Sequence, residues 1–445
     1  STDAASLFNE AIRNGLRCIY PHLGDFLVLV EIIQKLALQL NFDTFVDKDA
    51  LTHLSHLSGQ NFKRLTNAGS LVLIDIDYSN DSSVLKVSLS LANLRNDSFD
   101  DLSVIEENSD VVDGVISVTL SERAISKVSV LKNSAESILL DNLLTKDDGT
   151  LTLSNFPCNL RYLAAMDNHS TPSLDLFKYL DHVALILTAI GEIEGSDADF
   201  TKKIIGNLQL NCIEHQELGV FLTFWRDYKY LTNKLVGDMP NVYTMKCSIQ
   251  QFNDSIVLKT PELLENQREL FLDSKWTIND KKYVFKTPSV KESMDLVLHV
   301  DFNTPIVMSK VILQYLNLSV GIHGEDIPEI FQELNQRQEA KVEFPDNYLP
   351  QTTLHLLYPQ DYVCVKSVNF HSLGRIQQVI PVFRNILCLN NLIRTLTRRG
   401  TFLKFSDTEA QIRNNLKESL KLDESIMNEE LMNINLGGHD GLKKF

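Results

Sequence analysis

The feature that most constrains the fold is a change of hydrophobic period near Gly69. Before it, the apolar residues within 26–40 recur at three- and four-residue steps, which places them on one face of a helix. After it, residues 71–78 and 83–91 alternate apolar and polar side chains, as half-buried strands do. Further short alternating segments with polar turns fill residues 207–372, which predicts antiparallel sheet and not a regular βαβ order.

A chain of 445 residues is too long for one ordinary core, so several domains are expected. The helical period returns after residue 373, where Pro381 is expected to start or kink a helix. We therefore predict a multi-domain α+β fold with mainly antiparallel sheets flanked by helices. Its expected parts are a helical N-terminal segment (1–68), an α/β domain with an antiparallel hairpin (69–170), a second α+β domain rich in antiparallel strands (171–400), and a helical C-terminal extension and tail (401–445).

Composition excludes several classes of protein. A formal net charge of −16 argues against a surface built to hold nucleic acid, because such binding depends on clustered Lys and Arg. The longest apolar run, 26–40, is interrupted by Glu31 and Lys35, so we expect no membrane span. The six cysteines are far apart and form no C-x-x-C pair, which argues against a zinc module and against a disulfide framework. This use of cysteine is typical of a protein in a reducing compartment.

One candidate catalytic site is the pair Asp75-x-Asp77 in the stretch LVLIDIDYSND. Two carboxylates at this spacing hold a divalent metal in some sugar and phosphate transferases, so a metal-dependent transferase is the alternative hypothesis. A catalytic pair normally ends a strand at a cleft beside a nucleotide site, and we find no glycine-rich loop for one. The short polar turn and the matching strand that follow favour an ordinary hairpin.

The hairpin interpretation makes a prediction about register. If the loop spans residues 79–82, placing both apolar sets on the same side pairs Tyr78 with Ser83 and Asp75 with Lys86. The two aspartates then share a polar face with Lys86, Ser88 and Ser90, all on the second strand.

No other motif specifies a reaction. The phosphate-binding, metalloprotease and nucleophile-elbow patterns are absent, and His299-x-Asp301 is explained by the polar face of a strand. The spacing His53-x-x-His56 lacks a third ligand, so we favour a polar helix edge over a metal site. We therefore expect no enzyme, with no catalytic, cofactor-binding or metal-binding residues, and no cofactor.

Two leucine-rich segments are candidates for binding a protein partner. Residues 140–144 form an L-x-x-L-L sequence, which docks into receptor grooves only where its leucines are exposed; burial in the core is favoured here. In the C-terminal segment, Ile412, Leu416 and Leu420 lie one helical turn apart after a capping box that begins at Ser406. They are the partner-binding candidates, although the same stripe is equally suited to pack back on the body of the protein.

The order of four segments resembles a known family. LSHLSGQNFKRL, SLVLIDIDYSND, SILLDNLLTKDDGTLTLSNFPCNLRYLAAMD and LDLFKYL follow one another as in the conserved N-terminal region of fungal Mediator complex subunit 1. The resemblance covers residues 51–180, and it is weaker in the later helix IQQVIPVFRNILCLNNLIRTL.

The resemblance implies a nuclear, non-enzymatic subunit of the Mediator middle module, a coactivator that links transcriptional activators to RNA polymerase II. It also implies contact with other middle-module subunits, notably subunits four and nine, with no direct nucleic-acid contact and no membrane. Animal relatives carry L-x-x-L-L receptor boxes in a long extension. The L-x-x-L-L sequence of this chain lies inside the expected folded region, so receptor binding does not follow from it.

Overall fold

The computed structural model describes most of the chain between residues 25 and 397. Its pairings are antiparallel throughout the described strands, which confirms the predicted α+β class. No described helix is long and apolar enough to cross a bilayer. The described residues are 25–48, 62–79, 84–91, 103–107, 130–131, 134–144, 155–171, 175–195, 200–227, 241–251, 257–258, 274–286, 296–322, 327–342, 352–355 and 360–397.

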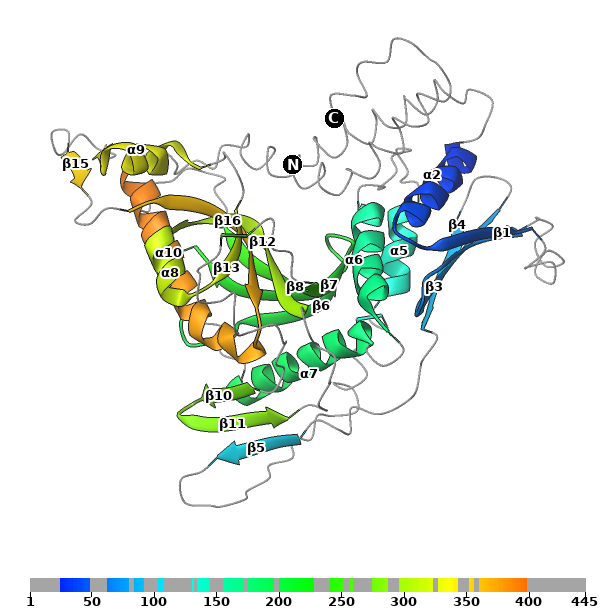
Figure 1. Ribbon diagram of the computed structural model, residues 1–445, viewed down its shortest axis with the longest axis horizontal. Helices are drawn as coiled ribbons and strands as arrows, with labels where there is room; N and C mark the ends of the chain where they lie inside the picture. The colour runs from blue at the N-terminus through cyan, green and yellow to red at the C-terminus, as the bar shows by residue number, and fades with distance from the viewer. Residues whose placement is uncertain are drawn as a thin grey trace, which may run out of the picture.

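A four-stranded sheet in the order β1-β2-β3-β4 forms one end of the molecule (Figure 1). Alternate residues of its strands are apolar, and these pack against helices on the inner side while the polar residues lie on the other side. The elements are α2 (Asp25–Gln39), β1 (Asp43–Asp47), β2 (Phe62–Ala68), β3 (Val72–Ser79), β4 (Val84–Leu91) and α5 (Ala135–Leu143).

A seven-stranded sheet in the order β6-β7-β8-β12-β16-β13-β9 forms the larger part. Helix α6 packs on β7 and β8, α7 contacts β6 and β8, and α10 contacts β7 and β12. The strands are β6 (Asn207–Cys212), β7 (Glu217–Arg226), β8 (Val242–Gln251), β9 (Val257–Leu258), β12 (Leu296–Ser309), β13 (Ser319–Ile322) and β16 (Tyr362–Phe370), and the helices are α6 (Asn155–His169), α7 (Leu176–Glu194), η4 (Leu373–Arg375) and α10 (Ile376–Thr397).

Two smaller sheets complete the described elements. The first has the order β10-β11-β5 and lies near α7, and the second is the pair β14-β15 beside α9 (Figure 1). Their bounds, with the remaining helices, are β5 (Ser103–Glu107), β10 (Ser274–Ile278), β11 (Lys281–Lys286), α8 (Lys310–Leu316), α9 (Glu329–Arg337), β14 (Glu339–Val342) and β15 (Thr352–His355).

One hydrophobic core joins the two large sheets. It extends from Val30 in α2 to Leu387 in α10 without a break in side-chain contact, and it includes residues of α5, α6 and α7 between the sheets. A smaller cluster around Phe331 holds α9 against β16 and the end of α10. Both sheets therefore pack as parts of one body.

Several expectations need correction. Residues 1–68 are not helical throughout, because β1 and β2 form there; β1 pairs with β2, and β2 pairs with β3. Strand β8 and helices α8 and α9 were not predicted. Pro381 lies within α10, in its second turn, and does not start the helix. The proposed domain boundaries stay a prediction, and residues 401–445 and the pair His53 and His56 lie outside the described residues.

Candidate functional site

Asp75 and Asp77 lie in the middle of β3, on the side of the four-stranded sheet away from the core. The expected register is wrong by two residues: Asp77, not Asp75, lies opposite Lys86, and Asp75 lies opposite Ser88. One residue of the shift arises at the hairpin end, where Tyr78 lies opposite Val84 and not Ser83, and the second arises from a β-bulge in which Leu85 is the extra residue. The predicted parity is confirmed, because both aspartates share a face with Lys86, Ser88 and Ser90.

The two carboxylates are held by side chains of β2. Arg64 donates to both oxygens of Asp77, from Nε at 2.7 Å and from Nη2 at 3.2 Å, and Thr66 Oγ1 donates to Asp75 at 2.7 Å. Asp77 is only 4% exposed, so the expected wet face is dry at this position. The hydrogen bond from Arg64 to Asp77 raises the pKa of the guanidinium, although burial opposes it.

These contacts disfavour a metal site at the pair. A bidentate guanidinium neutralises the charge of Asp77 and occupies one lone pair on each of its oxygens, and its own positive charge repels a metal cation. In the part of the chain that the structure describes, no three His, Cys, Asp or Glu residues gather closely enough to hold a metal ion.

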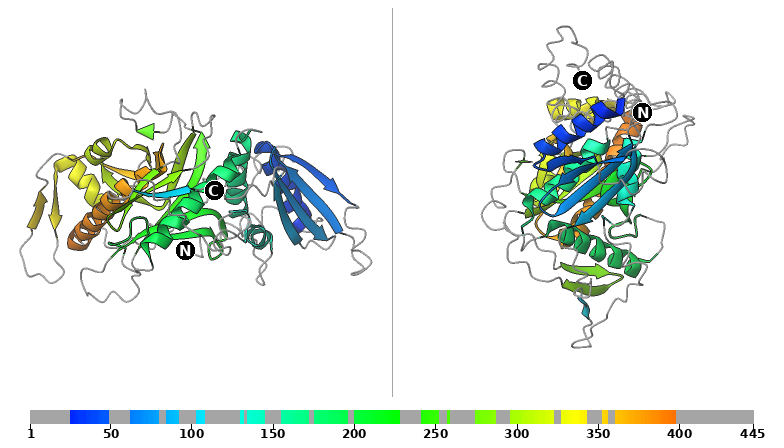
Figure 2. Two further views of the ribbon diagram at one scale, coloured as in Figure 1. Left: turned by 90° about the horizontal axis from the view of Figure 1, so that it is seen from below. Right: turned by 90° about the vertical axis from the view of Figure 1, so that its right-hand side faces the viewer.

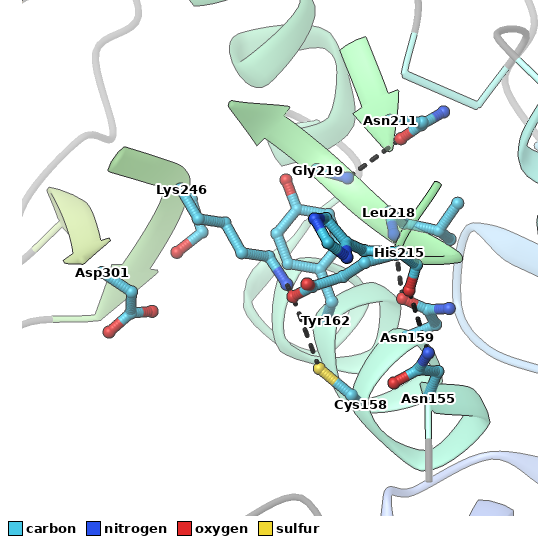
Figure 3. A network of polar contacts seen from close by, with 12 residues as sticks. Asn155, Cys158, Asn159, Tyr162, Asn211, His215, Leu218, Gly219, Lys246 and Asp301 are labelled. Atoms are coloured by element: carbon cyan, nitrogen blue, oxygen red, sulfur yellow. Dashed lines mark hydrogen bonds and ion pairs between the residues drawn. The ribbon is translucent and has the colours of Figure 1, made fainter. Parts of the chain in front are cut away.

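A second polar site lies where α5 and α6 meet the turn between β6 and β7 (Figure 3). Asn159 donates to the Gln216 carbonyl oxygen at 3.0 Å and to Asn142 Oδ1 at 2.7 Å, and its own Oδ1 accepts from the Leu218 N–H at 2.9 Å. Asn142 donates to the same Gln216 oxygen at 3.2 Å. We call Asn142, Asn155, Asn159 and Asn211 the asparagine clamp.

The outer members of the asparagine clamp hold the ends of the turn. Asn155, at the first turn of α6, donates to the His215 carbonyl oxygen at 2.9 Å. Asn211, in the left-handed conformation with φ 57°, accepts from the Gly219 N–H at 2.9 Å and donates to the Val130 carbonyl oxygen at 2.6 Å. Because Asn142, Asn159 and Asn211 are buried, these bonds are shielded from water and fix the helices to the large sheet.

Lys246 of β8 lies beside the asparagine clamp, and its side chain points toward α6 (Figure 3). Its Nζ is 2.6 Å from Glu217 Oε1 and 4.7 Å from the centre of the Tyr162 ring. Burial lowers the pKa of the Lys246 ammonium, but the Glu217 carboxylate outweighs burial and the pKa is raised. The ammonium therefore stays charged; it supplies an ion pair within the sheet, from β8 to β7, and a cation–π contact from the sheet to α6.

His299 and Asp301 lie side by side on β12, on the same strand face. His299 Nε2 is 2.9 Å from Asp301 Oδ1, and its Nδ1 is 2.6 Å from Asn369 Oδ1 on β16. Burial lowers the pKa of His299, but the charge of Asp301 and the two hydrogen bonds outweigh it and raise the pKa. Since both ring nitrogens are engaged, no nitrogen is left to take a proton from a nucleophile.

The leucines of the L-x-x-L-L sequence do not form one exposed face. Leu143 is buried in the core, Leu140 is partly buried against it, and Leu144 is 37% exposed at the end of α5. Burial, the favoured interpretation, therefore holds for Leu143 and in part for Leu140, and not for Leu144. The other candidates, Ile412, Leu416 and Leu420, lie outside the described residues.

Sequence reasoning missed the asparagine clamp and Lys246. One signal was available, because Asn142 interrupts the apolar run SILLDNLL at a position where the helical period requires a core residue. A polar residue in a core position needs a buried partner. The identity of that partner, a turn more than 70 residues away, was not accessible from local pattern.

A comparison with models of protein families finds a match. The family model described as "Mediator of RNA polymerase II transcription subunit 1" matches residues 24–398, which is most of the chain. A comparison with curated protein sequences found no match.

Proposed function

The chain belongs to the family of Mediator of RNA polymerase II transcription subunit 1, and on that premise we propose that it is a non-enzymatic structural subunit of the Mediator middle module. Membership makes it a Mediator subunit that acts in transcription regulation, and it implies a nuclear location. The finer assignment to the middle module, as a coactivator link between activators and RNA polymerase II, is the proposal.

The observation that carries this proposal is the rigid joining of two sheets by buried contacts. The continuous core and the asparagine clamp hold α5 and α6 to the β6–β7 turn. A subunit that sets the distance between partners benefits from such fixed geometry, because less conformational entropy is lost on assembly. In the described polar sites Arg64, Lys246 and His299 are each paired with a carboxylate, of Asp77, Glu217 and Asp301 respectively.

We propose other middle-module subunits, notably subunits four and nine, as direct partners. The net charge of −16 supports protein partners over nucleic acid, because phosphate backbones are repelled by an acidic surface. Transcriptional activators are proposed as further partners, bound directly or through neighbouring subunits.

We further propose that Ile412, Leu416 and Leu420 contribute to partner binding. The test is deletion of residues 406–445 followed by pull-down of subunits four and nine. A loss of one of them supports the assignment. Unchanged capture of both removes this segment from the partner-binding surface, as expected if the stripe packs on the body of the protein.

The experiment that tests the proposed function is affinity purification of the tagged full-length chain from its native cell, followed by mass spectrometry. We expect middle-module subunits to co-purify, with subunits four and nine retained at the highest salt because they are direct contacts. An untagged strain gives the background. Recovery without Mediator subunits would overturn the proposal, and recovery through another module alone would overturn the middle-module assignment.

A further inference from the structure

The four-stranded sheet has a second face that is not part of the core. In Figure 2 (right) the strands of this sheet are turned toward the viewer. The register places three rows of four residues, one from each strand, on this face, opposite to the buried Leu65, Ile74 and Val87. We call it the outer face: Asp43, Phe45 and Asp47 of β1, Arg64, Thr66 and Ala68 of β2, Leu73, Asp75 and Asp77 of β3, and Lys86, Ser88 and Ser90 of β4.

One row across the outer face is electrically balanced. Asp47, Arg64, Asp77 and Lys86 are successive partners across the four strands, so that the charges alternate in sign. Arg64 and Asp77 at its centre are joined at 2.7 Å. This row needs no further ligand, and it fixes the strands in register.

The other two rows contain carboxylates without a cation. Asp43 lies in a row with Ala68, Leu73 and Ser90, and Asp75 lies in a row with Phe45, Thr66 and Ser88. The only cationic side chains on the outer face, Arg64 and Lys86, belong to the balanced row. The two rows therefore have an excess of negative charge.

An exposed aromatic ring lies among these carboxylates. Phe45 is 54% exposed. It lies on the edge strand β1, whose other face is half-buried against the core. Asp43 and Asp47, both exposed, flank it on the same face at about 7 Å along the strand, the spacing of alternate strand residues. Asp75 lies in the same row, two strands away.

We propose that the outer face docks an arginine- or lysine-bearing segment of another protein chain, with the cation over Phe45 and its charge balanced by Asp43 and Asp75. A cation is attracted to the face of an aromatic ring, and nearby carboxylates strengthen this attraction. The partly exposed Ala68 and Leu73 offer apolar contact to the neighbouring residues of the segment. That the occupant is a protein rests on the proposed function, whereas its positive charge is inferred from the carboxylates and the aromatic ring of the outer face.

The first test is site-specific cross-linking. The photoreactive residue p-benzoylphenylalanine replaces Phe45 in the tagged full-length chain within native Mediator, and a matched probe replaces Tyr315, which is 87% exposed on α8. We expect position 45 to cross-link a Lys- or Arg-containing segment of another chain that the Tyr315 probe does not reach. The proposal would be overturned if position 45 formed adducts only with this chain's own residues, with a second copy of it, or with a neutral or acidic segment. It would also be overturned if position 45 formed no more adducts than the Tyr315 probe.

The second test uses the segment identified by cross-linking, synthesised as a peptide and titrated against the purified chain. We expect the variants Phe45→Ser and Asp43→Asn/Asp75→Asn to weaken binding by about fivefold or more, and raised salt to reduce the difference. Asn at position 75 keeps an acceptor for Thr66, and far-UV circular dichroism checks folding. Tyr315→Ser is the control. Equal affinity of all variants overturns the proposal, whereas failure of wild type to co-purify with Mediator subunits contradicts the proposed function instead.

Discussion

The asparagine clamp makes a quantitative prediction for Asn159→Ala. The side chain is fully buried and makes three hydrogen bonds, to Gln216, Asn142 and Leu218. Alanine leaves the buried Leu218 N–H without its acceptor and Asn142 Oδ1 without its donor, whereas the Gln216 oxygen keeps Asn142. At about 1–3 kcal/mol for each orphaned group, the free energy of unfolding of the junction falls by about 2–6 kcal/mol.

Hydrogen exchange measured by mass spectrometry checks this value where it arises. Peptides that cover the start of β7 in Asn159→Ala should exchange faster by a factor corresponding to the loss, while peptides of β3 change less. Asn155→Ala is the matched control, because Asn155 contributes a hydrogen bond to His215 that is more exposed to solvent than those of Asn159. Its loss is expected to cost about 1 kcal/mol or less. Equal protection of β7 in the two variants would refute the argument that buried orphaned groups dominate.

Three further predictions concern stability. Burial raises the pKa of Asp227, the residue after β7, to about 6, so this group stabilises the fold below the ordinary Asp pKa and the contribution is lost as pH rises through about 6. The urea midpoint of wild type minus that of Asp227→Asn should therefore decline between about pH 4 and 6. A difference that stays constant over this range would refute the raised pKa. Arg64→Met leaves the buried Asp77 carboxylate without its cation and should destabilise the four-stranded sheet by about 2–4 kcal/mol in thermal unfolding. The control Lys86→Met, at an exposed position of the same sheet, should cost about 0.5 kcal/mol. Gly206→Ala should lower the melting temperature, since a Cβ would collide with the Thr223 carbonyl oxygen at a φ of +109°, whereas Gly191→Ala in α7, with open space around it, should raise it slightly; the same sign for both would contradict this account.

Much of the fold was predictable because periodicity reports which face of an element is buried. The alternating segments that become β3, β4, β6, β7, β12 and β16 were identified in this way. Strand β8 was not identified, although its sequence VYTMKCSIQQ alternates as clearly: Tyr243, Met245, Cys247 and Ile249 are buried, and Lys246 occupies one of the polar positions between them. The early helical assignment failed for β1, whose residues DTFVD are mostly exposed and carry little core pattern.

The candidate sites depended more on distant contacts. The position of Asp75 and Asp77 on a polar face followed from the alternation, but their partners Arg64 and Thr66 follow from the pairing of β2 with β3. The pairing of Tyr78 with Val84 and the bulge at Leu85 each moved the register by one residue, and the total of two leaves unchanged which side chains share a face. A pattern of period two is unchanged by such a shift, so the alternation alone does not distinguish the two registers.

The sequence by itself determined the α+β class and the likeness to Mediator subunit 1, because both depend on the order and period of residues along the chain. Only the tertiary structure decided that Asn159 clamps a turn of the large sheet and that Phe45 lies exposed among carboxylates. The physical reason is that hydrogen bonding and exposure depend on neighbours brought together by folding. The local pattern identifies the apolar residues that are expected to be buried, while strand pairing and helix packing determine which of them are buried in the folded protein.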